Sequence, residues 1–590
     1  MLTQHHIACR LRTTLLAALI TLLALVSPVS GQTSDAESAV QAISTVTRWV
    51  HDFETPPIDS DRAAVALSDV TATCVQLRKR GRVIGFGMDD GGDDRMLRRA
   101  AGRALAATLN DRNVRELPEE LRSTIGADLT IEVELAGNLQ PVAGRRFARA
   151  AEAFDPGRHG IAVRRRDTLV WRFPCEMLAE GTAERVEQQI RQLAIELKLP
   201  PRAELDALIT EHDVSVYRFE TSHLVLPTGA AVPLVLQRGD TVVPMQRASL
   251  DTARELADDI AMHLINRFVD IDDPDKELEV IGFRADVRAN AALPPLQLEG
   301  ERNTLMGMIA LARYAGSSYV DQERATAARN VVRAYLDESS FTSESDDANI
   351  VALRVLMLYA WARLNEPVDR ASWTASHDAL RRVSNMQTTN FAPITQALIA
   401  YAASQTLMAS PSALDADRVR GLIESAMASV EEPQLPTLLP WLGWAALDYA
   451  HYTNSEIPGA DVLANTIDRL ASSLVGATDR PGPPELDGGI DLVAEDGAIR
   501  VSAQTTRPAA FLARLLHDQR LASENPIAMY GRHLRTLRFL EQLSLRPEMA
   551  WSSPGSTIAV GGLRQAMWDG AMPLPAQALG LETAVETLGP

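Results

Sequence analysis

The spacing of apolar residues divides the chain into two regions. In residues 36–225, segments with apolar residues three and four positions apart, typical of helices, alternate with segments in which every second residue is apolar, typical of strands. Helices are predicted at 42–53, 95–109 and 185–197, strands at 70–78, 83–87, 129–135 and 214–220, and a hairpin at 160–173. This mixture predicts an α+β domain with an antiparallel sheet, followed by a β-hairpin linker at 226–247.

Residues 248–590 are helix-periodic almost throughout, and the predicted helices are of two kinds. Charged, amphipathic helices are predicted at 250–268, 319–336, 373–383, 416–430, 460–475 and 526–543. Helices that are apolar around most of their circumference are predicted at 303–314, 348–364, 392–408, 435–452, 507–521 and 574–588. The first four apolar helices recur about every 44 residues, which is typical of stacked helical hairpins.

Six such hairpins predict an all-α (α/α)6 toroid over residues 248–590, with the apolar helices forming an inner ring. An open solenoid is the alternative arrangement. The pattern resembles the six-hairpin glycosidase, epimerase and terpenoid-cyclase-like superfamily, and Gly561-Gly562-Leu563-Arg564 is similar to the closing segment of some of its sugar-processing members. This resemblance implies an architecture and no particular reaction.

A motif in the first region carries a second resemblance. Residues 77–87 read LRKRGRVIGFG, a strand, a basic turn and a second strand that contain Gly81, Arg82, Gly85, Phe86 and Gly87. Further segments follow at 128–133, 157–163, 171–174, 197–201 and 216–219. Their order resembles the AMMECR-type domain (the AMME syndrome critical-region family), and the match covers residues 36–225.

The resemblance departs from the family at one informative position. The family's cysteine would fall at Phe86, whose side chain is neither a nucleophile nor a metal ligand. We therefore expect Phe86 to be a packing residue, and the resemblance implies a fold without the family cysteine.

The beginning of the chain predicts export. Arg10 and Arg12 precede a short apolar run at 15–26, and small residues at 29 and 31 predict signal cleavage after Gly31. An uncleaved anchor is the alternative; no other stretch reaches membrane-spanning length. We expect a secreted or periplasmic protein, in which Cys74 and Cys175 remain as free thiols or, alternatively, form one bridge.

Composition excludes several classes of function. The 590 residues carry 58 Lys and Arg against 77 Asp and Glu, a net charge of −19, and no segment has a sustained basic excess, which disfavours nucleic-acid binding. No phosphate-binding loop, nucleophile elbow, zinc-protease motif or dinucleotide fingerprint is present, and the histidines are scattered, so we expect no metal and no cofactor. The acidic segments 89–94 and 270–277 are interpreted as solvated turns rather than calcium sites.

Two groups of residues in the helical region are candidate ligand contacts. In a toroid the inner helices start at one mouth, which would present Glu301, Arg302, Asn303, Asp346, Asp347, Asn349, Asn390, Gln434, Thr505 and Arg507. Helix N-termini with such side chains suit polar or anionic ligands, although the same residues are also ordinary helix caps. Trp441, Trp444, Tyr449 and His451 crowd one inner helix, where they either stack on a sugar or form a core stripe.

These observations favour a binding or scaffold protein of the cell envelope that binds glycan or another envelope protein. Glu344, Asp346 and Asp347 are the nearest supply of the paired carboxyls that glycoside hydrolysis requires, and they serve equally well as helix caps and first-turn acids. A carbohydrate-active hydrolase or epimerase is therefore the second hypothesis, and a protein-interaction solenoid is the third. The sequence does not identify catalytic residues.

Overall fold

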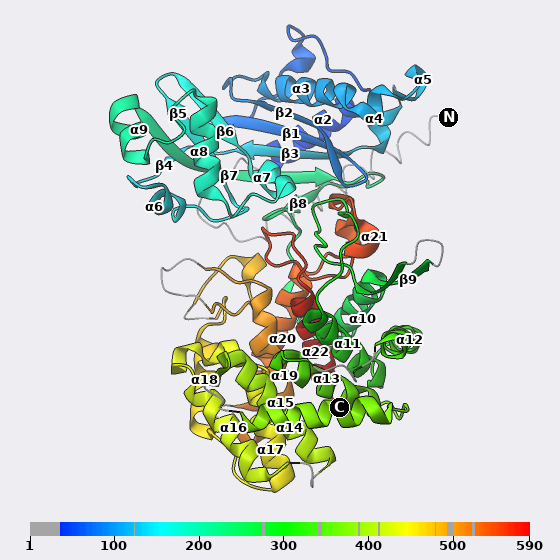
Figure 1. The fold of residues 1–590 in the computed structure, drawn as a ribbon. Helices are drawn as coiled ribbons and strands as arrows, with labels where there is room; N and C mark the ends of the chain where they lie inside the picture. The colour runs from blue at the N-terminus through cyan, green and yellow to red at the C-terminus, as the bar shows by residue number, and fades with distance from the viewer. Residues whose placement is uncertain are drawn as a thin grey trace. The chain divides into compact units, whose positions relative to one another are not determined.

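The structure is a computed structural model, and it describes residues 36–589 except 123, 274–277, 340, 342–344, 387–389, 411–413, 478–479, 493–498 and 522–524. The chain forms two compact units (Figure 1). Unit 1 comprises Met1–Thr241 and Trp551–Pro554, and unit 2 comprises Val242–Ala550 and Gly555–Pro590. The predicted signal peptide and its cleavage site lie outside the described residues.

Unit 1 is built on one antiparallel sheet with the strand order β2-β1-β3-β7-β5-β6. Two short strands, β4 and β8, also pair with β7. The strands are β1 (Ala72–Lys79), β2 (Arg82–Asp89), β3 (Thr130–Ala136), β4 (Gln140–Pro141), β5 (His159–Arg165), β6 (Thr168–Arg172), β7 (Val214–Leu226) and β8 (Leu234–Leu236). The alternating segments of the sequence are therefore strands, and the antiparallel α+β prediction is confirmed.

Two helices cover one face of this sheet. α2 (Ala36–His51) contacts β3 and β7, and α3 (Met96–Asn110) contacts β1 and β2 (Figure 1). The buried core between them contains Val46, Leu77, Ile131 and Val133. Odd-numbered residues of β1 and β3 point into this core because successive side chains of a strand face opposite sides.

The opposite face of the sheet is more polar. Its aromatic core contains Trp171, Phe173 and Phe219, whose rings pack edge to face or stacked. The other α-helices in the described part of unit 1 are α4 (Arg112–Arg115), α5 (Glu119–Arg122), α6 (Phe147–Ala151), α7 (Pro174–Glu180), α8 (Val186–Glu196) and α9 (Leu205–His212). Of these, α8 packs on β5 and α9 contacts β7.

Unit 2 is mainly helical. The helices that the sequence predicts as charged are α10 (Leu250–Arg267), α12 (Gln322–Glu338), α14 (Arg370–Asn385), α16 (Ala416–Ala428), α18 (Ala460–Ser472) and α20 (Pro526–Leu543). The apolar set is α11 (Glu301–Gly316), α13 (Ala348–Ala362), α15 (Pro393–Ala409), α17 (Trp441–Thr453), α19 (Thr506–Leu515) and α22 (Leu574–Leu588). A short helix, α21 (Ser556–Ala559), lies outside both sets.

The apolar helices contact one another in sequence order, from α11 through α13, α15, α17 and α19 to α22. α22 also packs against α10 and α11, which are the first helices of the unit. The N-terminal and C-terminal ends of unit 2 therefore lie together. In α13 and α15 nearly every residue is buried, which explains why these segments show no polar stripe.

Three details differ from the sequence prediction. β7 continues through residue 226 and pairs with β8, so part of the predicted linker belongs to the sheet. β9 (Phe268–Asp273) and β10 (Leu278–Phe283) form a hairpin, so the first four residues of the segment interpreted as a solvated turn, 270–273, are in a strand. α17 begins at Trp441, because the preceding residues 432–438 form a 3-10 helix that contains two prolines.

None of the helices in the described part of the chain is long and apolar enough to cross a bilayer.

Candidate functional site

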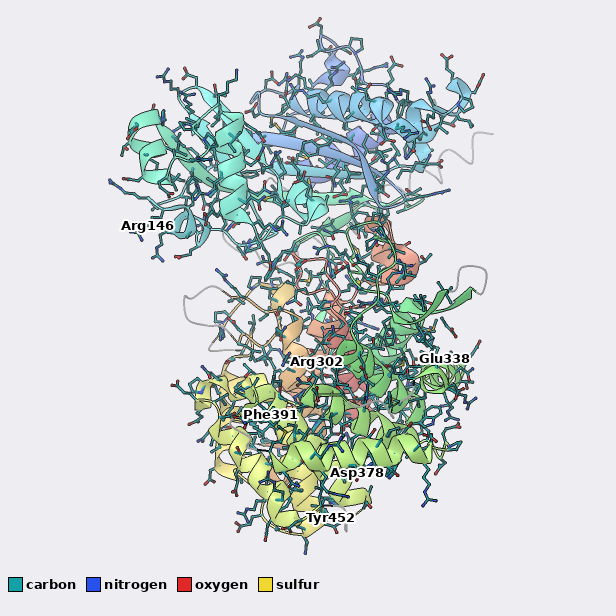
Figure 2. The ribbon with its side chains drawn as sticks, in the orientation of Figure 1. Arg146, Arg302, Glu338, Asp378, Phe391 and Tyr452 are labelled. Atoms are coloured by element: carbon teal, nitrogen blue, oxygen red, sulfur yellow. The ribbon has the colours of Figure 1, made fainter. Side chains whose placement is uncertain are left out.

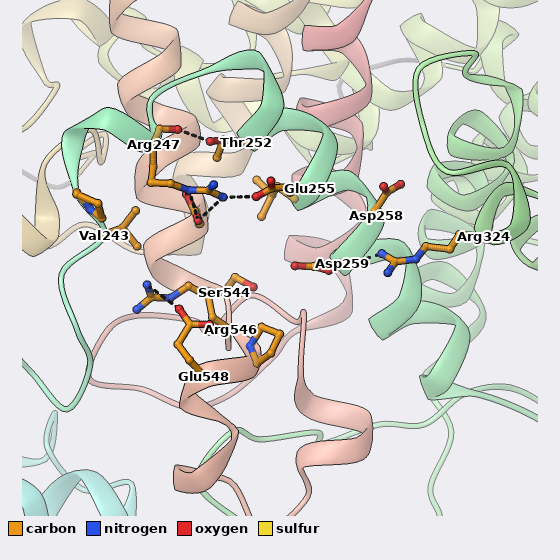
Figure 3. Close-up of a pocket in the computed structure, with 14 residues that line it drawn as sticks. Val243, Arg247, Thr252, Glu255, Asp258, Asp259, Arg324, Ser544, Arg546 and Glu548 are labelled. Atoms are coloured by element: carbon orange, nitrogen blue, oxygen red, sulfur yellow. Dashed lines mark hydrogen bonds and ion pairs between the residues drawn. The ribbon is translucent and has the colours of Figure 1, made fainter. Parts of the chain in front are cut away.

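Unit 2 contains a groove of about 530 Å³ with many charged side chains in its lining, shown in Figure 3. It lies between α10, the start of α12, the end of α20 and the segments 243–247 and 544–548. Three arginines and five carboxylates line it, namely Arg247, Arg324, Arg546, Glu255, Asp258, Asp259, Glu541 and Glu548. The volume is within the range of about 300–1,000 Å³ typical of small-molecule sites, and the charged lining suits a hydrophilic ligand.

Arg247 is held by carboxylates from two helices. Its guanidinium pairs with Glu255 of α10 and lies 2.8 Å from Oε1 of Glu541 in α20 (Figure 3). Hydrogen bonds to these two groups raise the pKa of Arg247, so it remains charged. Thr252 donates its hydroxyl hydrogen to the Arg247 carbonyl, which fixes the backbone beside the groove. These contacts define the position of Arg247 on this side of the groove.

Two adjacent carboxylates of α10 occupy the other side. Tyr314 donates its hydroxyl hydrogen to Asp258 at 2.5 Å, and the backbone N–H of Asp321 donates to the same oxygen at 3.2 Å. Asp259 lies 3.6 Å from the guanidinium of Arg324 in α12. Burial raises the pKa of Asp259, and the neighbouring Asp258 and Glu255 add to this effect against the opposing charge of Arg324.

Sequence reasoning missed this groove. The lining belongs to the charged helices and their connections, which the sequence indicates as an outer surface. One signal was present: Glu255, Asp258 and Asp259 are spaced three and four positions apart on α10, so they share one face. Nothing in the sequence places Arg324 or Arg546 opposite that face.

The predicted mouth residues have local partners or lie exposed. Glu301 pairs with Arg354 at 2.7 Å, and the Asn303 amide donates to Glu299 at 2.9 Å. Asp347 caps α13 by accepting from the Asn349 backbone N–H at 2.8 Å. Asp346, Asn390 and Gln434 are exposed. None of the ten predicted mouth residues lines the groove.

Thr505 and Arg507, which are predicted to contact a ligand at the mouth of the toroid, have little surface exposed to solvent. Thr505 is fully buried, and its hydroxyl oxygen accepts from the backbone N–H of Ile490 at 3.2 Å. Residue 490 belongs to the long segment before α19, so that segment covers Thr505. Arg507 is half-buried and donates to the Thr437 carbonyl at 3.2 Å, and burial together with the charge of Arg302 lowers its pKa. Arg302 itself is exposed at the start of α11 (Figure 2).

The members of the predicted aromatic group differ in their exposure. Trp441, Trp444 and Tyr449 are buried, whereas His451 is exposed. The two tryptophan rings are 5.6 Å apart and both pack against Tyr401 of α15. Because indole and phenol rings bury large apolar areas, Trp441, Trp444 and Tyr449 are part of the helical core.

A buried charge network accompanies these aromatics. Arg313 of α11 lies over the Trp444 ring, 4.9 Å from its centroid, and pairs with Glu582 of α22 at 2.8 Å. Arg514 of α19 pairs with Asp448 of α17. The network thus joins four apolar helices, and its opposite charges compensate one another.

The motif residues of unit 1 have structural roles. The turn between β1 and β2 has positive φ at Arg80 and Gly81, the geometry of a two-residue hairpin turn. A Cβ at position 85 would lie 2.5 Å from the Ala104 carbonyl oxygen, and one at 87 would lie 2.1 Å from that of Ala100. Glycine at both positions therefore lets α3 pack directly on β2.

Arg82 and Phe86 complete this description. Arg82 forms a two-pronged pair with Asp111, with distances of 2.8 and 2.9 Å. Phe86 is half-buried and packs against the aromatic core, directly opposite Gln76 in the β1–β2 register. Phe86 therefore makes packing contacts, as expected from the sequence.

The polar face of the sheet holds a buried cluster of four charged or titratable side chains, Arg78, Glu132, Glu134 and His223, which we call the sheet cluster. Glu132 pairs with Arg78 and lies 3.2 Å from Nε2 of His223. Nδ1 of His223 lies 3.2 Å from Oε1 of Glu134. Burial opposes ionisation of Glu132, but Arg78 and His223 outweigh it and hold the pKa at about 2.

Among the described residues, no group of histidine, cysteine, aspartate and glutamate side chains could hold a metal ion. This applies both to the sheet cluster and to the acidic segment 89–94, which we call the acidic loop. In the acidic loop, Asp89 and Asp93 both pair with Arg99, at 2.7 and 2.8 Å. Asp90 accepts a hydrogen bond from the Trp171 indole at 2.9 Å. These carboxylates therefore serve local ion pairs and hydrogen bonds.

No protein-family model matches the chain, and no curated protein matches it. Among solved structures, the chain is similar to the uncharacterized protein PH0010 from Pyrococcus horikoshii, with 14% sequence identity and a TM-score of 0.25. The alignment covers 34% of this chain and 98% of that chain. A likeness at this level carries no argument about fold or activity.

Proposed function

We propose that the protein is an exported, non-catalytic binding protein whose unit 2 holds a glycan in the groove between α10, α12 and α20. The observation that carries this proposal is the groove itself, a cavity of about 530 Å³ lined by three guanidinium and five carboxylate groups. Guanidinium groups donate and carboxylates accept hydrogen bonds, and sugar hydroxyls do both. Charge-assisted hydrogen bonds of this kind are stronger than neutral ones.

The ion pairs of the groove support binding without large rearrangement. Arg247 is already fixed by Glu255 and Glu541, and Arg324 is already close to Asp259. Side chains that are ordered before binding lose less conformational entropy when the ligand arrives. None of the described residues that line the groove is aromatic, so recognition relies on hydrogen bonds rather than on stacking.

The test is a binding panel of neutral, acidic and amino oligosaccharides, read by calorimetry, with a parallel assay for cleavage or isomerisation. Arg324→Gln and Arg546→Gln should each weaken binding at least tenfold, whereas Arg420→Gln should leave it unchanged. Arg420 is a matched control because it forms an exposed 2.8 Å pair with Glu424 on α16, away from the groove. Binding that survives both groove substitutions contradicts the proposal.

One observation favours the second function, a carbohydrate-active enzyme. Asp259 is a groove carboxyl with a raised pKa, which is the property of a general acid. If the protein turns a sugar over, Asp259→Asn should abolish turnover and preserve binding. If no oligosaccharide is bound or changed, the remaining partner class is another protein of the envelope.

We also propose that unit 2 is a closed (α/α)6 toroid and not an open solenoid. The support is the contact of α22 with both α10 and α11, together with the order of contacts along the apolar helices. An open solenoid keeps contacts between neighbouring repeats only. Removal of α22 should therefore increase amide exchange in α10 and α11, not only in α19.

The assignment of unit 1 to an AMMECR-type fold remains a proposal. Its support is the motif at Gly81, Arg82, Gly85, Phe86 and Gly87, which occupies the β1–β2 hairpin under α3. Because Phe86 stands at the position of the family cysteine, we assign this unit no reaction. Export is tested by N-terminal sequencing of the protein recovered outside the cytoplasm, which should begin at Gln32.

A further inference from the structure

The two cysteines of unit 1 lie side by side in its core. Cys74 of β1 and Cys175 of α7 are separated by 101 positions in the sequence, yet their Sγ atoms are 3.6 Å apart. Both are buried and both are free thiols. A disulfide has an S–S distance of about 2.05 Å, so the two sulfur atoms need to approach by only about 1.5 Å.

The two elements differ in their freedom to make this approach. Cys74 lies in a strand that pairs on one side with β2 and on the other with β3. Cys175 is the second residue of a seven-residue helix whose N-terminus has no side-chain cap from Phe173. Its backbone N–H donates to Glu134 at 3.2 Å. Because β1 is paired on both sides, we expect the approach to come from the first turn of α7, with the hydrogen bond to Glu134 adjusting.

We infer that Cys74 and Cys175 form one intramolecular disulfide when the chain meets a thiol–disulfide oxidant, either a small-molecule disulfide or the disulfide of an oxidoreductase. One cysteine loses its proton and attacks a sulfur of the oxidant, forming a mixed disulfide and releasing one thiolate. The second cysteine loses its proton and displaces the other half of the oxidant. The two thiolates released from the oxidant take up the two protons, so the oxidant is reduced to two thiols.

Burial determines when this reaction takes place. Burial raises the pKa of Cys74 to about 11 and also raises that of Cys175, so the reactive thiolates are scarce in the folded protein. The bridge should therefore form during folding or when α7 opens. Once formed, it should resist reducing agents because the same burial shields it.

The bridge would close a long loop that contains most of the sheet. Closing such a loop restricts the unfolded chain, and the stabilising effect of a disulfide increases with loop length. The oxidised protein should therefore unfold at a higher temperature than the reduced protein. This inference does not depend on the ligand of the groove in unit 2.

The test is to refold the full chain in a mixture of oxidised and reduced glutathione and to map its peptides without reduction. We expect a linked pair of peptides containing Cys74 and Cys175, lighter by two hydrogen atoms than the separate peptides, with Cys9 left out of the link. Protein that is reduced while unfolded and then refolded with a reductant should have a lower thermal midpoint, and Cys74→Ala and Cys175→Ala should each abolish that difference.

Two results would overturn the inference. Complete alkylation of both cysteines after oxidative refolding shows that the bridge does not form. A link from either cysteine to Cys9 or to a second chain shows that the pair is not specific. If an alanine variant fails to fold, the peptide map of the unsubstituted protein is sufficient to show whether the disulfide forms.

Discussion

His223 and Glu134 face each other across β7 and β3, with Nδ1 of the imidazole 3.2 Å from Oε1 of the carboxylate. The other ring nitrogen lies 3.2 Å from Glu132, so one imidazole lies between two buried carboxylates. Removal of one partner of a buried ion pair leaves the other charge without compensation. His223→Ala should therefore lower the free energy of unfolding by about 3–5 kcal/mol, measured by urea denaturation.

The same residue predicts a dependence of stability on pH. Burial lowers the pKa of His223, but the charges of Glu134 and Glu132 outweigh it and raise the pKa above the ordinary value of 6.5. The stabilising contribution is thus complete below about pH 6.5 and is lost as the pH rises through the folded-state pKa. The stability advantage of the unsubstituted protein over His223→Gln should shrink above pH 6.5.

His263 of α10 predicts the opposite trend in unit 2. Burial and the charge of Arg267 lower its pKa to about 3, and its Nδ1 lies 2.6 Å from the Ile558 carbonyl oxygen. The unfolded chain takes up a proton near pH 6.5 and the folded chain does not, so stability is lost as the pH falls from about 6.5 towards 3. His263→Gln should reduce this acid sensitivity in urea titrations at pH 7 and pH 4.5. If the loss of stability between pH 7 and pH 4.5 is the same in His263→Gln as in the unsubstituted protein, His263 is accessible to protons in the folded state.

Two glycines within helices should respond in opposite directions to alanine. A Cβ at Gly443 of α17 would lie 2.4 Å from the Phe511 ring, so Gly443→Ala should cost about 1–3 kcal/mol. Position 421 of α16 has open space, so Gly421→Ala should stabilise by about 0.5–1 kcal/mol. Thermal unfolding of the two variants measures both effects. Equal shifts would contradict the close packing of α17 on α19.

Phe86 and Phe219 allow a graded test of the aromatic core in unit 1. Phe219 is fully buried, and its substitution by alanine should cost about 3–5 kcal/mol. Phe86 is half-buried at the edge of the same core, so Phe86→Ala should cost about half as much, roughly 2 kcal/mol. A stability for Phe86→Ala equal to that of the unsubstituted protein would indicate a functional rather than a packing position.

The sequence predicts the secondary structure of this chain more completely than its binding surface. The apolar segments at 348–364 and 392–408 become α13 and α15 because a helix without a polar face has to be buried on all sides. The hairpin of β9 and β10 was missed because the acidic residues at 270–273 mask the alternation that indicates a strand. The high content of acidic residues led to the interpretation of this segment as a turn.

The sheet cluster shows why polar residues were harder to place. Alternation along β1 and β3 identifies Arg78, Glu132 and Glu134 as one face, and polar residues in a strand usually indicate exposure to solvent. Glu132 and Glu134 are buried instead, because Arg78 and His223 come from other strands and compensate the charges of the two carboxylates. The groove escaped prediction for the same reason, since Arg324 and Asp259 meet only through the packing of α12 and α10.

The contact of α22 with α10 and α11 has a consequence for biosynthesis. The surfaces of α10 and α11 that α22 covers leave the ribosome long before α22 is made. At translation rates of about 5–20 residues per second, that interval is on the order of tens of seconds. Until α22 is complete, the apolar surfaces of the first helices are open to chaperones and to association with other nascent chains.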